Sequence, residues 1–206
     1  LKSLEKAQRY SSLVELRADF IKNIKADDVK KLKAKTKGTS IFTCRKVNEG
    51  GRYTGSYNEQ QAILKAAFDA GFTYVDVSYD NPFTSSITGK QQKQLLLSYH
   101  NFKDTPASIE IIAILERMRE YAPAIMKVAT MVKSTKNIYT LGEVLKQQMD
   151  KEKLIVIGMG EQGRMTRAMF PILGSYLTYA SDSKSAGPAI MTHKELETIY
   201  KIIFKK

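Results

Sequence analysis

Short apolar runs rich in β-branched residues recur along the chain about every 25 to 30 residues, which is the length of one βα unit. We expect seven strands, at residues 13–18, 40–45, 73–79, 94–100, 125–132, 154–159 and 175–181. Several of these runs are apolar on both faces, which is typical of parallel strands buried on both sides of a sheet. The pattern therefore predicts an α/β fold.

Helix start signals lie between the predicted strands. Capping boxes begin at Ser56, as S-x-x-E, and at Thr192, as T-x-x-E, and each predicts the start of a helix. We also expect one helix capped by Thr105, with the following proline at its first position, and another that begins near Thr140. No linker interrupts the alternation, so we expect a single domain over residues 1–206.

Two arrangements of such units remain open from the pattern alone. A doubly wound sheet and an eight-stranded barrel both agree with seven parallel strands. The first residue is not methionine and residues 1–11 are typical of a helix, so we expect that an opening strand has been lost from the N-terminus. The count would then be eight, which favours a compact (β/α)8 TIM barrel.

The net charge of +12 raises the question of a nucleic-acid partner, because many lysines gather in residues 21–38. That segment has no aromatic or arginine side chains on which bases could stack. We interpret it as a solvated helix and turn with Lys30, Lys31, Lys33, Lys35 and Lys37 outside, and expect no nucleic-acid partner. A net positive field would still attract a small anionic substrate.

Cysteine and histidine are scarce. Cys44 is the single cysteine, and the two histidines lie far apart in the sequence, so a disulfide framework and a metal site are not expected. No apolar run approaches the roughly 18 residues that a membrane span needs. We expect a cytoplasmic protein without a membrane partner.

Polar and charged residues stand at or near the downstream ends of the predicted strands, where the catalytic groups of a barrel gather. Lys127 is the sharpest of them, because it interrupts the apolar run at residues 125–132. A buried lysine is costly unless it is paired or loses its charge, and a neutral amine can form a Schiff base with a ketone. The alternative is a lysine that reaches solvent or pairs with a carboxylate.

His100 ends the predicted strand just before that of Lys127. Adjacent strands lie about 5 Å apart, so the imidazole could reach a group bound to Lys127 and act as a general acid and base. Glu49 could orient or tune the imidazole. The alternative is a core histidine that is hydrogen-bonded to the backbone.

The segment GMGEQG, at residues 158–163, matches the dinucleotide-binding spelling G-x-G-x-x-G. It comes late in the chain, and only one more predicted strand follows it, whereas a dinucleotide fold needs it near the start of a βαβαβ half. We therefore expect no cofactor. A glycine-bearing loop beside Arg164 and Arg167 is suited instead to a carboxylate or a phosphate.

Seven blocks, in order, resemble the type I 3-dehydroquinate dehydratase family over nearly the whole chain. They are VELRAD, FTCRKVNEGG, YVDVS, SYHNF-x-x-TP, IMKVATM-x-KS, MGEQGRMTR and GSYLTYAS. The resemblance implies a (β/α)8 barrel in which a lysine forms an imine with 3-dehydroquinate and a histidine moves protons, giving 3-dehydroshikimate on the route to aromatic amino acids. No cofactor is implied, and a homodimer is expected from the resemblance alone.

The resemblance also implies residue roles. Lys127 matches the imine lysine, His100 the proton-transferring histidine and Glu49 the acid that pairs with it. Arg167 matches the arginine that binds the substrate carboxylate. The other residues implied to contact substrate or order the site are Glu15, Arg17, Arg45, Asp76, Met159 and Ser185.

Three departures from the family pattern stand out. The family's opening strand is absent before residue 1, and Ser78 stands where an acidic residue is common. The loop that usually reads S-A-P-G-Q is here S-A-G-P-A, from Ser185 to Ala189, which puts substrate affinity and loop closure in doubt. Two alternatives therefore stay open: a barrel that binds a small carboxylate without turnover, and another imine-forming barrel such as an aldolase.

Overall fold

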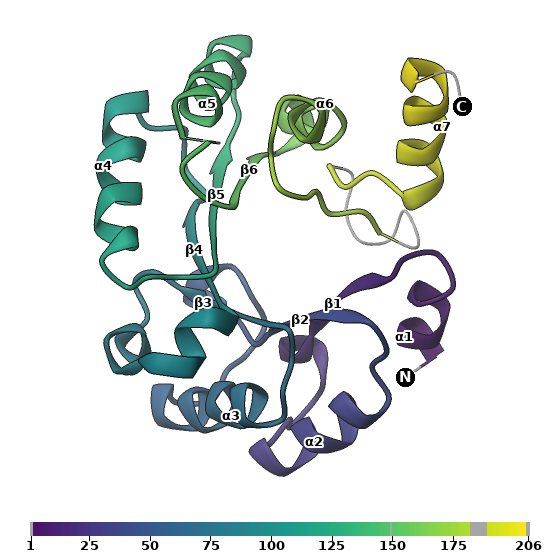
Figure 1. The fold of residues 1–206 in the computed structure, drawn as a ribbon, viewed down its shortest axis with the longest axis vertical. Coiled ribbons are helices and arrows are strands. Elements are labelled where there is room, and N and C mark those ends of the chain that lie inside the picture. Colours follow the sequence, from purple (N-terminus) through teal and green to yellow (C-terminus); the bar gives the residue numbers. More distant parts are fainter. Residues whose placement is uncertain (1, 149, 182–188, 205–206) are drawn as a thin grey trace. The chain divides into compact units, whose positions relative to one another are not determined.

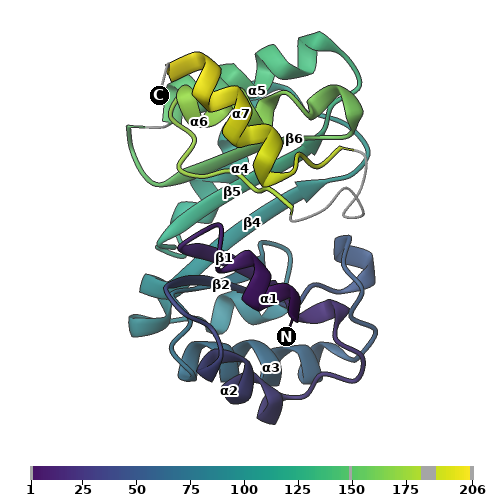
Figure 2. The same ribbon diagram turned by 90° about the vertical axis from the view of Figure 1, so that its right-hand side faces the viewer.

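The computed structural model describes residues 2–148, 150–181 and 189–204, and the chain divides into two compact units. Unit 1 comprises Leu1–Ser98 and Met118–Ala124, and unit 2 comprises Tyr99–Arg117 and Ile125–Lys206. Strands alternate with helices in both units (Figures 1 and 2). This alternation is the α/β pattern predicted from the apolar runs.

Unit 1 is built on parallel strands that pair in chain order, β1 with β2, β2 with β3, and β3 with the first half of β4. Its helices α2 and α3 lie side by side along these strands (Figure 1). The elements are α1 (Lys2–Ala7), β1 (Leu13–Arg17), η1 (Ala18–Phe20), α2 (Ala26–Ala34), β2 (Thr39–Thr43), η2 (Val47–Glu49), α3 (Tyr57–Asp69), β3 (Tyr74–Ser78), η3 (Pro82–Ser86), η4 (Gly89–Gln94) and the start of β4 (Leu95–Asn101).

The core of unit 1 follows from the sequence pattern. Ile41, Phe42, Val75 and Leu96 are fully buried, as expected for strands with both faces covered. The predicted capping box at Ser56 is confirmed: Ser56 Oγ accepts from the backbone N of Glu59 at 3.2 Å, and the Glu59 carboxylate accepts from the backbone N of Ser56 at 2.7 Å.

Unit 2 contains the end of β4 and the parallel strands β5 and β6, which pair from Met126 with Leu154 to Met131 with Met159. The sheet order places β5 between β4 and β6. Helices α5 and α6 pack against β6, and α7 packs against α6. The elements are α4 (Ser108–Arg119), β5 (Ile125–Met131), α5 (Thr135–Gln148), β6 (Leu154–Met159), η5 (Glu161–Gly163), α6 (Thr166–Ile172) and α7 (His193–Phe204).

The predicted seventh strand at residues 175–181 is wrong: the described part of the chain contains six strands. The segment still runs beside β6, because the backbone N of Tyr176 donates to the carbonyl of Leu154 at 2.8 Å. However, the backbone N of Val156 donates to the side-chain Oγ of Ser175 rather than to a carbonyl. A side chain thus replaces a backbone acceptor and interrupts the ladder. Only Ser181 forms an isolated bridge, with Thr192.

Two predicted helix starts are also wrong. Helix α4 begins at Ser108, because the hydroxyl of Thr105 bonds to Thr130 and to the carbonyl of Met131 and so does not cap the helix. Helix α5 begins at Thr135. The side chain of Asn137, in its first turn, reaches back and accepts from the backbone N of Lys133 and of Ser134. A side-chain oxygen that accepts from the free backbone N–H groups at a helix start favours that start, and the Asn137 side chain supplies this oxygen in α5.

The capping box at Thr192 is confirmed. Thr192 Oγ1 accepts from the backbone N of Glu195 at 3.3 Å, and the Glu195 carboxylate accepts from the backbone N of Thr192 at 2.8 Å. These bonds, together with Arg164, lower the pKa of Glu195 to about 2. In the described residues, no helix is both long enough and apolar enough to cross a lipid bilayer.

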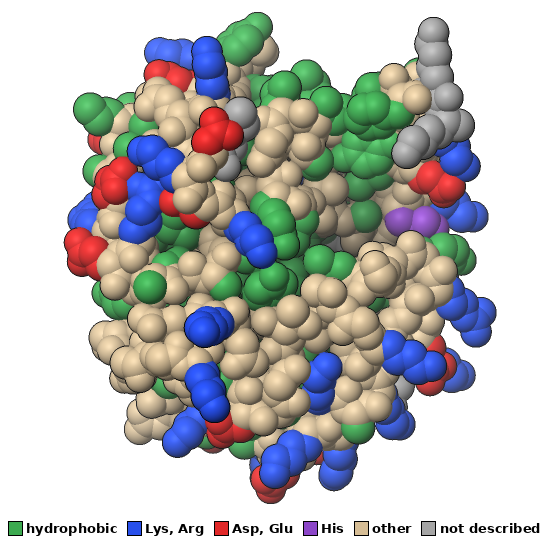
Figure 3. All heavy atoms as spheres, in the orientation of Figure 1, with side chains coloured by type: hydrophobic (Ala, Val, Ile, Leu, Met, Phe, Trp, Pro, Cys, Tyr) green, Lys and Arg blue, Asp and Glu red, His purple; other side chains and the backbone are tan. Residues whose placement is uncertain are grey.

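The lysine-rich segment is largely solvated, as predicted. Lys30, Lys31, Lys35 and Lys37 are exposed, whereas Lys33 is half-buried with its Nζ atom 5.6 Å from the centroid of the Phe72 ring. On the face drawn in Figure 3, basic side chains are scattered and acidic ones lie among them. Such a surface is typical of a solvated face.

Candidate active site

A buried ion pair in unit 1 joins three strands. Arg45, which follows β2, donates through Nη2 to Asp76 Oδ1 on β3 at 2.6 Å and to Ser98 Oγ on β4 at 3.1 Å. Ser98 Oγ also donates to Asp76 Oδ1 at 2.6 Å. The Arg45 side chain is 7% exposed and that of Asp76 is 0% exposed. Buried charges need such bonds to offset their loss of hydration, so this network holds both groups in one arrangement.

The end of β1 carries a second charged pair. Arg17 donates through Nε and Nη2 to the two carboxylate oxygens of Asp19, at 2.9 and 2.7 Å. Burial alone would lower the pKa of Arg17, but the hydrogen bonds and charge of Asp19 outweigh it and raise that pKa above its usual value. The guanidinium also lies 4.7 Å from the ring centroid of Phe20. This two-bond geometry fixes the plane of the arginine head.

Glu15 lies on β1, two residues before Arg17. Its Oε1 atom accepts from Thr43 Oγ1, at the end of β2, at 2.7 Å. The residue is half-buried. One carboxylate oxygen is thus tied to the neighbouring strand.

Glu49 in η2 is held by amides from three directions. Its carboxylate accepts from Asn81 Nδ2 at 3.1 Å, from Gln60 Nε2 at 3.3 Å and from the backbone N of Lys46 at 3.2 Å. Gln60 is 2% exposed and Asn81 is 5% exposed. Cys44 lies beside this cluster, and burial raises the pKa of its thiol to about 12.

In unit 2, Lys127 lies within β5 and is 7% exposed, so the expected burial of this lysine is confirmed. Its Nζ atom lies 4.5 Å from the ring centroid of Tyr179. An amine over the face of an aromatic ring is attracted by the ring's quadrupole. The amine of this buried strand residue is therefore in contact with an aromatic side chain.

His100 lies near the end of β4, the strand next to β5 in the sheet order, and it is half-buried. Its ring stacks on that of Phe102 with 5.8 Å between centroids and 14° between planes. Met159 ends β6 and is half-buried. His100, Phe102 and Met159 belong to unit 2, as does Lys127.

Arg167, in α6, is 8% exposed. Its Nε atom donates to the carbonyl of Ala189 at 3.3 Å and its Nη1 atom to the carbonyl of Tyr179 at 3.4 Å. Both bonds are long and go to neutral acceptors. Ser185 lies outside the described residues.

The glycines of the GMGEQG segment have packing roles. A Cβ atom on Gly163 would come within 2.5 Å of the backbone carbon of Gly158, and Gly160 has a φ of +79°. Thr166 Oγ1 accepts from the backbone N of Gly158 at 2.9 Å and donates to the carbonyl of Gly163 at 2.7 Å. The segment is a tight connection from β6 to α6. The backbone N–H of Gly158 donates to Thr166 within the protein and so is not directed at a ligand.

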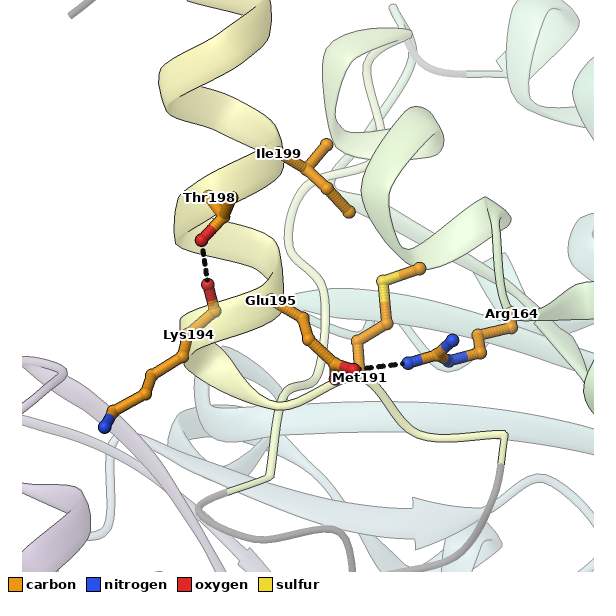
Figure 4. A pocket seen from close by; sticks show the side chains of 6 residues that line it. All are labelled: Arg164, Met191, Lys194, Glu195, Thr198 and Ile199. Atoms are coloured by element: carbon orange, nitrogen blue, oxygen red, sulfur yellow. Dashed lines mark hydrogen bonds and ion pairs between the residues drawn. The ribbon is translucent and has the colours of Figure 1, made fainter.

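A separate surface pocket of about 400 Å³ lies in unit 2 between α7 and the turn that precedes α6 (Figure 4). Arg164 lines it and pairs with Glu195 at 2.8 Å, so this arginine supports the start of α7. The other lining residues are Met191, Lys194, Thr198 and Ile199. Among the described residues, no group of His, Cys, Asp or Glu side chains is arranged to hold a metal ion.

Sequence reasoning did not single out four of these residues, namely Asp19, Gln60, Asn81 and Tyr179. Gln60 had a signal, because it continues the buried stripe of α3 at the spacing of Ile63, Leu64 and Ala67. A polar residue on such a stripe needs partners. Tyr179 lies in the segment predicted as a seventh strand, and no local pattern indicates its contact with Lys127.

Comparison with known proteins assigns the chain to a family. A family model described as Type I 3-dehydroquinase matches residues 1–206. This chain belongs to the type I 3-dehydroquinase family.

Proteins with similar sequences support the same family. The 3-dehydroquinate dehydratase of Coxiella burnetii (strain RSA 493 / Nine Mile phase I) is 36% identical over 207 residues, covering 100% of this chain and 88% of that protein. The 3-dehydroquinate dehydratase of Methanocaldococcus jannaschii is 30% identical over 210 residues, covering 98% of this chain and 92% of that protein.

Solved structures give the same result for the fold. The 3-dehydroquinate dehydratase of Aquifex aeolicus VF5 superposes with a TM-score of 0.85 at 25% identity, covering 100% of this chain and 94% of that chain. The enzyme from Geobacillus kaustophilus HTA426 gives 0.85 at 24% identity, covering 99% and 85%. The expected α/β class is confirmed, and the fold is that of the type I dehydroquinases, which are TIM barrels.

The chain is accordingly an enzyme of this family, and the activity that its family and relatives support is the dehydration of 3-dehydroquinate in the shikimate pathway.

Proposed function

We propose that this enzyme dehydrates 3-dehydroquinate to 3-dehydroshikimate through a Schiff base on Lys127. The observation that carries the proposal is the environment of this amine. Lys127 is buried in β5, and its Nζ atom lies over the Tyr179 ring. An amine kept from bulk water is suited to attack on a ketone, and the resemblance of the surrounding sequence to the family implies this role for Lys127.

The proposed chemistry conserves atoms in each step. The amine of Lys127 attacks the ketone carbon, and loss of one water gives the imine. The imine withdraws electrons from the neighbouring carbon, so His100 can remove a proton there. The electron pair then expels the hydroxyl group, which leaves as water with the proton that His100 returns. Hydrolysis of the product imine consumes one water and releases Lys127.

The family resemblance supports the roles of the remaining residues. Arg167 binds the substrate carboxylate, because a guanidinium can bind its two oxygens at once. The resemblance implies that Glu49 pairs with His100 and orients its imidazole. Substrate hydroxyls and the apolar wall are assigned to Glu15, Arg17, Arg45, Asp76 and Met159, with Ser185 contributed by the loop outside the described residues.

Borohydride reduction in the presence of 3-dehydroquinate tests the proposal. The reagent turns an imine into a stable amine, so we expect a covalent adduct that peptide mass spectrometry assigns to Lys127. The Lys127→Ala variant is expected to give neither adduct nor the absorbance of the enone product. Wild-type turnover without any trapped adduct would contradict the Schiff base.

Lys153 provides a matched control. Its Nζ atom also lies over a tyrosine ring, 5.0 Å from the centroid of Tyr176, but the residue is exposed. The Lys153→Ala variant is expected to form the adduct and to turn over as wild type does. Ligand binding without enone absorbance in the wild type would favour the alternative of a barrel that binds a carboxylate without turnover.

A further inference from the structure

Two primary amides that the proposed chemistry does not use are buried beside Glu49 in unit 1. Gln60 lies in the first turn of α3 and Asn81 is the N-cap of η3, so the two come from segments far apart in sequence. They are 2% and 5% exposed. Buried amides are costly unless each polar atom finds a partner, and here all of them do.

Backbone groups determine which way each amide points. Asn81 Oδ1 accepts from the backbone N of Phe83 at 3.0 Å, so its Nδ2 atom must face the other way. Gln60 Nε2 donates to the carbonyl of Cys44 at 2.8 Å, so its Oε1 atom is the acceptor on the opposite side. The oxygen and nitrogen atoms of a side-chain amide are nearly the same in shape. The two backbone hydrogen bonds determine which position of each amide is the oxygen and which is the nitrogen.

The donors then converge on one carboxylate. Asn81 Nδ2 donates to Glu49 Oε1 at 3.1 Å and to Gln60 Oε1 at 2.9 Å. Gln60 Nε2 donates its second hydrogen to Glu49 Oε2 at 3.3 Å. All four amide hydrogens are used, so rotation of either amide would break at least two bonds.

We propose that Gln60 and Asn81 form an amide clamp, a pair of positioning residues that holds the Glu49 carboxylate in one orientation and on which turnover depends. This inference rests on the proposed role of Glu49 in orienting His100. A carboxylate on the surface could rotate freely, whereas a group that orients a catalytic base must itself be held, because misplacement of about 1 Å can cost about 100-fold in rate.

Variants of the clamp test the inference. We expect Asn81→Leu and Gln60→Met to lower kcat by about 10- to 100-fold, with KM within about threefold of wild type because neither amide binds substrate. Gln94→Met is the matched control. Gln94 also donates to a backbone carbonyl in unit 1, that of Phe72 at 2.8 Å, but does not contact Glu49. It is expected to lower thermal stability and leave kcat unchanged.

A double-variant cycle separates positioning from folding. In the Glu49→Gln background, Asn81→Leu is expected to lower kcat by less than about twofold, because the clamp acts through Glu49. A loss as large in that background as in the wild type would overturn the clamp. Circular dichroism and thermal unfolding report whether each variant is folded.

The isosteric variant Asn81→Asp keeps the inference testable if Asn81→Leu does not fold. It places a carboxyl oxygen where Nδ2 now lies 3.1 Å from Glu49 Oε1. Two carboxyl groups this close share a proton, so the pH profile of kcat should gain an ionisation that the wild type lacks. A profile identical to that of wild type would refute the clamp.

The same measurements distinguish the clamp from the proposed function. Wild-type protein that does not dehydrate 3-dehydroquinate, or a Glu49→Gln variant with wild-type kcat, would remove the proposed role of Glu49 and the clamp with it. If Glu49→Gln is impaired while both clamp variants keep wild-type kcat, only the clamp is wrong.

Discussion

The amine of Lys127 lies over the face of the Tyr179 ring, with 4.5 Å between Nζ and the ring centroid. Lys127 comes from β5, whereas Tyr179 comes from the irregular segment that follows α6. The proposed nucleophile is therefore contacted by a residue about fifty positions further along the chain.

We expect Tyr179→Leu to slow adduct formation several-fold, because the Lys127 side chain loses the ring that it packs against and a displaced nucleophile reacts more slowly. Tyr179→Phe retains the ring and should form the adduct nearly as fast as wild type. Single-turnover trapping with borohydride measures both rates. Equal rates for the leucine variant and the wild type would show that the ring does not orient the amine.

His100→Ala is expected to reduce turnover by roughly 100- to 10,000-fold, the usual contribution of a general acid and base, while the imine still forms. Enone absorbance measures the first effect, and borohydride trapping measures the second. The other histidine, His193 in the first turn of α7, supplies the control, and His193→Ala should retain turnover. Loss of the adduct in His100→Ala would mean that the imidazole has another role.

The buried pair of Arg45 and Asp76 leads to a stability prediction. Arg45→Met removes the guanidinium partner of a fully buried carboxylate, and we expect the free energy of unfolding to fall by about 3–5 kcal/mol. The double variant with Asp76→Asn should recover part of this loss because the buried charge is also gone. Urea unfolding followed by circular dichroism measures both changes. A double variant less stable than Arg45→Met alone would contradict this explanation.

Burial of Cys44 gives a pH prediction. Its pKa rises from 9.0 to about 12 on folding because burial disfavours the thiolate. This contribution to stability is fully present below pH 9 and is lost as the pH rises from about 9 to about 12. At pH 8 we therefore expect the native thiol to react with a disulfide reagent only as fast as the protein unfolds. Rapid labelling of native protein would contradict the buried neutral thiol.

Several features could be predicted because short-range chemistry determines them. The six strands that form coincide with apolar runs, and the capping boxes at Ser56 and Thr192 are local sequence motifs. The burial of Lys127 followed from its place in such a run. The helix starts at Ser108 and Thr135 were missed because nearby side chains bonded in ways the local motif did not reveal.

The sequence by itself determined the alternation of strands and helices and the burial of Lys127 within one of the strands, since both follow from local periodicity and residue type. Only the tertiary structure decided that Gln60 and Asn81 meet at Glu49, that Tyr179 covers the amine of Lys127 and that Ser175 interrupts the last predicted strand. These contacts join residues far apart in the chain. Their geometry depends on how whole elements pack, and no local pattern encodes that packing.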